Sequence, residues 1–256
     1  MKKSKLLDFI SKYHLGGNIE SVIWNVKNGE FSVRFMSEDS HLLAEIIMKN
    51  LSETILVNGK EMNGEVAELG VYSTSQLIKL LNVVDDDIAL SLVKVDRGQY
   101  GEVYGSFKIE DKSDVKAGIN FMLTETSVIH PTPVIEKLPD FDLKLILDSS
   151  FKKKFINGKN ALPDDEIFTI ITTNDTVKVV IGHQTINTNR VTILPEIEGE
   201  FKKIDNISFN STFLKEILTA NSEAEELFLK VSTQGLAVIE VTTADFDAKY
   251  YLIAQK

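Results

Sequence analysis

Two clusters of lysines are the residues of this chain best suited to chemistry, and the chemistry that they suit is contact with phosphate. One cluster lies in the first helical segment and the other near the middle of a chain whose formal net charge is −10. An acidic protein that gathers its lysines in this way is expected to hold a polyanion loosely, along one surface. With two further helical lysines, the candidate set is Lys2, Lys3, Lys5, Lys12, Lys79, Lys152, Lys153, Lys154, Lys159 and Lys215.

Every member of this set is a lysine, which favours loose contact over specific contact. Lysine is a flexible point charge, whereas arginine offers a rigid fork to a phosphate. Phosphate contacts carry no base-sequence information, and counterions weaken each of them at working salt. For any single residue, decoration of a solvated helix face is an equally good interpretation. The prediction therefore concerns the clusters as groups.

Helical spacing of apolar residues occurs in four places, and two of them contain the lysine clusters. The stripes begin at Leu6, Leu77, Phe151 and Leu214. Candidate N-capping residues precede two of the stripes, at Ser73–Thr74 and at Asn210–Thr212. Almost everything else alternates between apolar and polar residues, as strands do. The expected fold class is α+β, with helices packed on antiparallel sheets.

The order helix, strands, helix, strands occurs twice, which indicates two similar domains. Expected hairpin turns at Asn28–Gly29 and Asn174–Asp175 occupy the same place in each copy. Three of the five prolines lie in a short stretch between the copies, where they favour an extended, semi-rigid connector. We therefore expect a first domain at 1–123, a linker at 124–140 and a second domain at 141–256.

Composition argues against several classes of protein. The 256 residues are 43% hydrophobic and 26% charged, as in a soluble globular protein, and no apolar run approaches the ~18 residues that span a bilayer. Asp8 and Lys12 interrupt any signal-peptide core, so we expect a cytoplasmic protein. There are no cysteines, and the four histidines lack metal-ligand spacing. We expect no catalytic activity, no metal and no cofactor.

Three segments resemble the DNA sliding clamps, the ring-shaped processivity factors of replicative DNA polymerases. Residues 36–42, Met-Ser-Glu-Asp-Ser-His-Leu, resemble a Met-Asp-Ser-Ser-His-Val run of the eukaryotic clamps. Residues 249–256 resemble their closing Tyr-Tyr-Leu-Ala-Pro-Lys, with Gln255 in place of the proline, and residues 209–218 match the strand, cap and inner helix of the family. The start of the chain is closest in style to the clamp of T-even bacteriophages.

The resemblance implies a homotrimeric ring of two-domain subunits that encircles double-stranded DNA without reading its sequence. Its partners would be a replicative DNA polymerase and an ATP-dependent clamp loader, with no membrane involved. A viral clamp would act in the cytoplasm of the host cell.

The resemblance also implies two sets of contact residues. A pocket for partner peptides would involve His41, Leu42, Val128, Ile129, Ile253 and Ala254. Ring closure would pair two edge strands, expected at Val115–Leu123 and at Thr176–Gly182. Their interface residues would be Val115, Ala117, Ile119, Phe121, Val177, Val179 and Ile181. From the sequence alone, either segment is equally well an interior strand, and the apolar linker residues are equally well anchors of the linker.

Three alternatives stay open at this point. A monomeric processivity factor of the herpesvirus type would grip DNA by a basic face, with steep salt dependence and no ring. A structural virion protein would bind neither DNA nor a polymerase peptide. An enzyme would need a concave site with convergent titratable groups.

Overall fold

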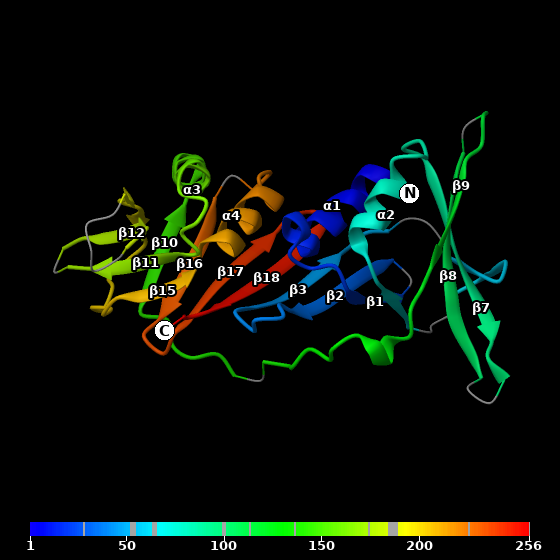
Figure 1. Ribbon diagram of the computed structural model, residues 1–256, viewed down its shortest axis with the longest axis horizontal. Helices are drawn as coiled ribbons and strands as arrows, with labels where there is room; N and C mark the ends of the chain where they lie inside the picture. The colour runs from blue at the N-terminus through cyan, green and yellow to red at the C-terminus, as the bar shows by residue number, and fades with distance from the viewer. Residues whose placement is uncertain are drawn as a thin grey trace. The chain divides into compact units, whose positions relative to one another are not determined.

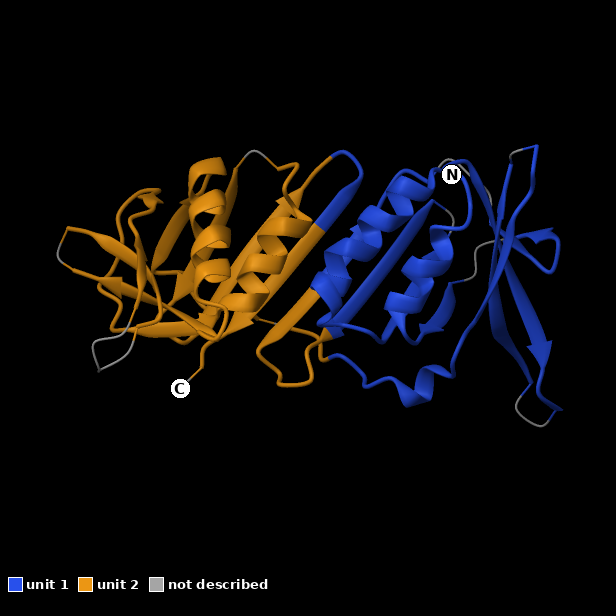
Figure 2. Ribbon diagram, turned by 45° about the horizontal axis from the view of Figure 1, so that its top comes forward, with its two compact units in different colours: residues 1–35, 45–132, 244–247 blue, residues 36–44, 133–243, 248–256 orange. Residues whose placement is uncertain are grey.

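A computed structural model of the chain describes residues 1–27, 29–51, 55–62, 66–98, 101–112, 114–135, 137–173, 175–183, 189–224 and 226–255. The expected hairpin turns include Asn28 and Asn174, which lie outside these ranges. The chain forms two compact units, coloured separately in Figure 2. Unit 1 comprises residues 1–35, 45–132 and 244–247, and unit 2 comprises residues 36–44, 133–243 and 248–256.

Two helices and two groups of strands make up most of unit 1. The helices are α1 (Lys3–His14) and α2 (Thr74–Leu81), and a 3-10 turn, η1 (Leu15–Gly17), follows α1. Neighbouring strands run in the order β3 (Leu42–Met48), β2 (Glu30–Met36), β1 (Val22–Lys27) and β6 (Ala67–Val71). Figures 1 and 2 show α1 and α2 on one face of these strands.

Aromatic side chains fill the space between α1 and the strands beneath it. Phe9 lies edge-on to Trp24, with ring centroids 5.5 Å apart, and edge-on to Tyr13 at 5.7 Å. Phe31 joins the cluster 5.9 Å from Trp24. All four rings are fully buried, so the apolar stripe of α1 is the core of this unit.

A separate five-stranded sheet completes unit 1. Its order is β5 (Lys60–Glu61), β4 (Leu56–Val57), β7 (Ile88–Asp96), β8 (Glu102–Asp111) and β9 (Gly118–Met122). β4 pairs in parallel with β7, whereas β7, β8 and β9 pair antiparallel. β9 is therefore an edge strand.

Unit 2 contains the other two helices, α3 (Ser149–Ala161) and α4 (Ser211–Ala220). One run of strands has the order β14 (Glu196–Ile197), β10 (Leu143–Leu147), β16 (Leu227–Ser232), β17 (Leu236–Thr242) and β18 (Phe246–Ile253). A four-stranded sheet has the order β13 (Val191–Ile193), β12 (Val177–Ile181), β11 (Ile167–Thr172) and β15 (Ile207–Asn210).

The N-terminal caps of three helices can be compared with the predicted caps. Asn210 caps α4 as expected, because its side-chain oxygen accepts a hydrogen bond from the backbone N–H of Phe213 at 2.9 Å. Asp148 caps α3 through the N–H of Phe151 at 2.7 Å. Ser73 takes the N-cap position of α2 but makes no side-chain cap, and its φ of 62° is left-handed. The predicted Ser73 cap is therefore wrong, whereas the four predicted helices are confirmed.

The linker begins with a close backbone contact. Thr124 donates its N–H to the carbonyl of Gly70 at 2.9 Å, at the outer edge of β6. A Cβ atom on Gly70 would collide with the carbonyl oxygen of Thr124, so glycine is required there. A 3-10 turn, η3 (Thr126–Val128), follows.

None of the described helices has both the length and the apolar character that a membrane-spanning helix needs.

Candidate functional site

The first lysines of the chain contact groups in their own unit. Lys2 forms an ion pair with Asp87 at 2.8 Å, and both side chains are more than half exposed. Lys3 donates from Nζ to the carbonyl oxygen of Val84 at 2.6 Å. Hydrogen bonding to Asp87 raises the pKa of Lys2 despite some desolvation. The turn that precedes β7 therefore pairs the amine of Lys2 with a carboxylate and holds that of Lys3 with a carbonyl oxygen.

Lys5 and Lys12 are held more tightly. Lys5 pairs with Asp245 at 2.5 Å and also donates to the carbonyl oxygen of Lys49 at 2.9 Å. Lys12 has no exposed surface. Its Nζ lies 3.2 Å from Asp8 and 4.8 Å from the centre of the Phe246 ring. The amine of Lys12 is thus part of the core of unit 1.

Two lysines of α3 also turn inward. Lys152 donates to the carbonyl oxygen of Ala224, and Lys159 donates to those of Pro163 at 2.7 Å and Asp165 at 3.0 Å. Each residue is only 6% exposed, and desolvation lowers the pKa of each amine. The sequence predicts that Lys12, Lys152 and Lys159 face DNA. The burial of all three contradicts that prediction, because neighbouring carboxylate or carbonyl oxygens hold their amines inside the fold.

Three of the predicted lysines keep their amines in solvent. Lys79 on α2 and the pair Lys153 and Lys154 on α3 are exposed, and none has a polar partner among the described residues. Lys215 on α4 is intermediate, because it pairs with its neighbour Glu216 at 3.0 Å. The exposed lysine pair of α3 is the densest free positive charge in the predicted set.

The rest of the exposed face of α3 suits contact with a polyanion. Ser150, Asn157 and Asn160 share exposure with the lysine pair. α3 contains no acidic residue at any position, so nothing on the helix itself repels a phosphate. Hydroxyl and amide groups form weaker hydrogen bonds to phosphate oxygens than charged groups do. We call Ser150, Lys153, Lys154, Asn157 and Asn160 the α3 face.

The predicted edge strands have different outcomes. β9 is an edge strand, as predicted. Its residues Ile119 and Phe121 are buried, and its last residue, Met122, is 66% exposed. Just before it, Ala117 donates its N–H to the Asp111 carboxylate at 3.1 Å, and Val115 is 88% exposed.

β12 is an interior strand, so the predicted edge at Thr176–Gly182 is wrong. It pairs with β11 along one side and with β13 along the other, and Val177, Val179 and Ile181 are buried. The terminal strands of this sheet are β13 and β15, and Leu194, directly after β13, is 66% exposed.

An apolar cluster in unit 2 joins the linker to strands β3, β17 and β18. Its buried members are Leu43, Val238 and Tyr251, and the half-buried side chains of Ile135, Phe141 and Leu236 pack against them. We call these six residues the linker cluster. The signal for it in the sequence was the alternation of β3 and β18, which places Leu43 and Tyr251 on the face opposite to Leu42 and Leu252.

None of the predicted pocket residues belongs to this cluster, but four of them are neighbours in sequence of its members on β3 and β18. Ile253 donates its N–H to the carbonyl of His41 at 2.9 Å, and the side chain of Ile253 is 38% exposed. Ala254 donates to the carbonyl of Gly235. Leu42, in contrast, is completely buried. The side chain next to it in sequence, that of Leu43, is the one that reaches the linker.

The two linker residues predicted for the pocket are not members of the linker cluster. Val128 ends the 3-10 turn and is 62% exposed, and Ile129 is half-buried. Ile135 and Phe141, further along the linker, occupy the cluster instead.

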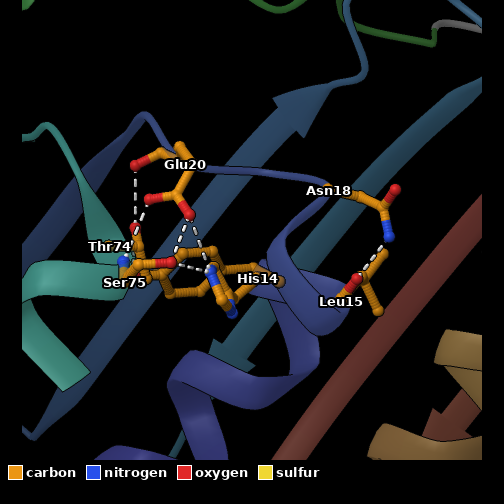
Figure 3. A network of polar contacts seen from close by, with 7 residues as sticks. His14, Leu15, Asn18, Glu20, Thr74 and Ser75 are labelled. Atoms are coloured by element: carbon orange, nitrogen blue, oxygen red, sulfur yellow. Dashed lines mark hydrogen bonds and ion pairs between the residues drawn. The ribbon is translucent and has the colours of Figure 1, made fainter. Parts of the chain in front are cut away.

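A polar network around Glu20 joins the two helices of unit 1 (Figure 3). One oxygen of Glu20 accepts a hydrogen bond from the backbone N–H of Ser75 at 3.0 Å, and the other contacts His14 Nε2 at 3.2 Å. Burial raises the pKa of Glu20, but the bonds from Ser75 and His14 outweigh it and hold the pKa below its ordinary value. Glu20 thereby caps the start of α2, where Ser73 does not.

This network resembles a Ser-His-Glu triad in composition but not in geometry. The Ser75 hydroxyl lies 3.1 Å from His14 Nε2, the same nitrogen that contacts Glu20. A proton relay needs the two ring nitrogens to bind different partners. The arrangement therefore serves to hold the end of α1, the segment before β1 and the start of α2 together. Among the described residues, no group of three or more acidic or histidine side chains is placed to hold a metal ion.

Among the described residues, each unit has two α-helices packed with mainly antiparallel strands, which is the α+β fold of the sliding clamps of the PCNA type. The crystal structure of Proliferating Cellular Nuclear Antigen from Entamoeba histolytica matches with a TM-score of 0.73 and 16% sequence identity, over 100% of this chain and 96% of that one. PCNA from Thermococcus kodakaraensis matches with a TM-score of 0.70 and 12% identity, over 100% and 98% of the two chains. No protein-family model and no curated protein sequence matches.

Proposed function

We propose that this protein is a sliding clamp, a DNA polymerase processivity factor without catalytic activity of its own. The observation that carries the proposal is the similarity in fold to two PCNA structures over the whole chain and nearly all of theirs. A clamp holds DNA by encircling it, so a tethered polymerase stays on its template without tight affinity for DNA.

The α3 face is the part of the molecule that we assign to DNA. Lys153 and Lys154 supply two exposed amines without carboxylates beside them on the helix. Lys79 and Lys215 add weaker contacts. Few point charges and several neutral donors suit a ring that must slide, because each phosphate contact is weak and independent of sequence.

The ring is a homotrimer that closes through β9 of one copy and β13 of the next. Both are terminal strands, and no other described strand pairs with their outer sides. Exposed apolar side chains accompany both, with Met122 on β9 and Leu194 after β13. Heterologous contacts of this kind form a closed ring when the rotation between copies fits.

Partner peptides from the polymerase and from an ATP-dependent clamp loader bind at the linker cluster and at Ile253 beside it. Apolar linker side chains that remain exposed, Val134 and Leu138, enlarge the contact surface.

The domain boundaries at 123 and 141 and the bacteriophage origin stay predictions. Neither of the two similar structures comes from a phage.

The mass of the protein in solution tests the assembly. Light scattering over a range of concentrations should give a species near three times 28.7 kDa that dissociates on dilution. Met122→Glu should shift this species toward the monomer, because it places a charge at the contact between copies. Val66→Glu is the matched control, since Val66 is also an exposed apolar residue but lies outside β9. A monomer at every concentration would exclude the ring and favour the basic-face grip.

The topological hold on DNA is tested separately. After loading onto nicked circular DNA, the protein should stay bound at high salt and should leave when the circle is cut. Rapid release from intact circles would instead indicate ordinary electrostatic binding.

A further inference from the structure

Asp142 stands at the junction of the linker and β10, and its carboxylate is fully engaged. One oxygen accepts a hydrogen bond from Lys202 Nζ at 2.7 Å. The other accepts from the backbone N–H of Thr233 at 2.9 Å and from its hydroxyl at 2.8 Å. The residue is 8% exposed. A buried carboxylate with this many donors ties together the chain segments that supply them.

The backbone of Asp142 is held as firmly as its side chain. Its N–H donates to the carbonyl of Val231 at 2.8 Å, and its carbonyl accepts from the N–H of Lys202 at 3.0 Å. The end of the linker is thus bound to β16, to the turn between β16 and β17 and to the segment that leads to β15. The hydrogen bond from Lys202, with those from Thr233, holds the pKa of Asp142 at about 2, so the anchor is charged at physiological pH.

The residue before this anchor is part of the linker cluster. Phe141 packs against the buried group formed by Leu43, Val238 and Tyr251. An anchor one residue away removes most of the backbone freedom that Phe141 would otherwise have. The position of the Phe141 ring on the cluster therefore depends on the Asp142 contacts.

We propose that Asp142 is a positioning residue of the partner-peptide site, because its contacts with Lys202 and Thr233 hold Phe141 in the linker cluster. This inference rests on the proposed function, since it assigns a role at the site where partners bind. Loss of the anchor leaves Phe141 to be ordered at the moment of binding. Ordering one side chain and its backbone at that moment weakens affinity by about five- to tenfold.

The test uses this chain and a fluorescein-labelled synthetic peptide of about ten residues whose apolar and aromatic side chains match the apolar linker cluster. Asp142→Asn should bind this peptide about five- to tenfold more weakly than the wild type. Thr233→Val removes one hydroxyl donor and keeps the N–H, so it should cause a smaller loss and supplies a second variant if Asp142→Asn fails to fold. Glu200→Gln is the matched control, an exposed carboxylate outside the linker, and should bind as the wild type does.

A double-mutant cycle separates positioning from general damage to the fold. In a Phe141→Ala background, Asp142→Asn should cause no further loss of peptide affinity, because the ring that it positions is gone. Since the chain has no native cysteine, a spin label on Leu138→Cys reports linker mobility, which should rise in Asp142→Asn. A label on Ser150→Cys in α3 should not respond.

The outcomes distinguish this inference from the proposed function. Equal peptide binding by the wild type and Asp142→Asn, or an equal loss with and without Phe141, overturns the positioning role alone. A wild type that does not bind the peptide overturns the assignment of the partner site to the linker cluster, and the positioning role with it.

Discussion

Helices α1 and α3 resemble each other in sequence and differ in what their lysines do. Each helix has lysines in its first half. Each also packs aromatic side chains against strands of its own unit. The lysines at the start of α1 contact aspartates and carbonyl groups. Lys153 and Lys154 of α3 face solvent without such partners among the described residues. Every lysine of the set on α1 is thus engaged, whereas α3 both buries two lysines, Lys152 and Lys159, and presents two in solvent.

The two helices also begin differently. Asp148 caps α3 with its own side chain, so the first turn needs no further anion. The N-cap of α1 is Lys2, which makes no such bond. Asp86 supplies the missing acceptor, because its carboxylate accepts from the N–H of Ser4 at 2.9 Å. Carboxylates from the turn before β7 therefore interact favourably with the dipole of α1. The same carboxylates pair with Lys2.

The largest expected effect is the loss of stability on replacing Lys12, the buried lysine of α1. Lys12→Glu replaces the partner of Asp8 with a like charge in the core, so unfolding should become easier by about 3–5 kcal/mol. Lys153→Glu, on the exposed face of α3, should change the free energy of unfolding by less than about 0.5 kcal/mol. Chemical denaturation of both variants measures this. Equal stability of the two would contradict the burial of Lys12.

The next effect compares two glycines at close approaches. Gly70→Ala meets backbone at Thr124, which has little room to move, and should cost about 1–3 kcal/mol. Gly158→Ala on α3 meets only side-chain atoms of Val191 and Ile181, at 3.0 and 3.3 Å. The gain in helix propensity, about 1 kcal/mol, should offset most of its cost. Thermal unfolding of the two variants compares their losses of stability. A larger loss for Gly158→Ala than for Gly70→Ala would contradict the view that backbone contacts yield less than side-chain contacts.

Charge reversal on the two helices should separate their roles in DNA binding. Lys153→Glu with Lys154→Glu should weaken binding to duplex DNA at least about tenfold and flatten its salt dependence. The logarithmic slope should change by about 0.9 for each phosphate that the variant no longer neutralises. Lys2→Glu with Lys3→Glu carries the same change of charge on α1 and should weaken DNA binding less. Fluorescence anisotropy at several salt concentrations gives both numbers. Similar weakening in the two variants would mean that net charge alone governs binding.

The smallest expected effect is an acid transition in unit 2. The folded pKa of Asp142, about 2, lies below its ordinary value of about 3.9. The carboxylate therefore adds stability above about pH 4, and that stability is lost as the pH falls toward 2. Urea unfolding of the wild type should show the decline, and Asp142→Asn should show less of it. Glu20, also with a lowered pKa but a side chain 40% exposed, should contribute less than Asp142 because solvent screens it.

Much of the fold follows from local patterns. The four apolar stripes predict α1 to α4, and Asn210 predicts the start of α4, because helical spacing and capping depend on residues only a few positions apart. The cap of α2 is different. Its acceptor is Glu20, more than 50 residues away in sequence, and no local pattern points to it.

The strand edges and the partner cluster show the same limit. β12 has the alternating residues of any half-buried strand, and only its pairing with β13 makes it interior. Ile135 and Phe141 have the same apolar character as Val128 and Ile129, yet only the first two belong to the cluster around Tyr251. Which strand pairs with which, and which linker residue meets the sheet, depends on contacts between distant segments.

By itself, the sequence determined the class of fold, the four helices and the concentration of lysines near two of them, and it predicted a duplication. Each of these depends on periodicity and composition within short windows. Only the tertiary structure decided which lysine amines are free, which strand is an edge and which residues anchor the linker. An amine turns inward when carbonyl or carboxylate oxygens from remote segments lie within hydrogen-bonding reach, and the folded chain alone sets those distances.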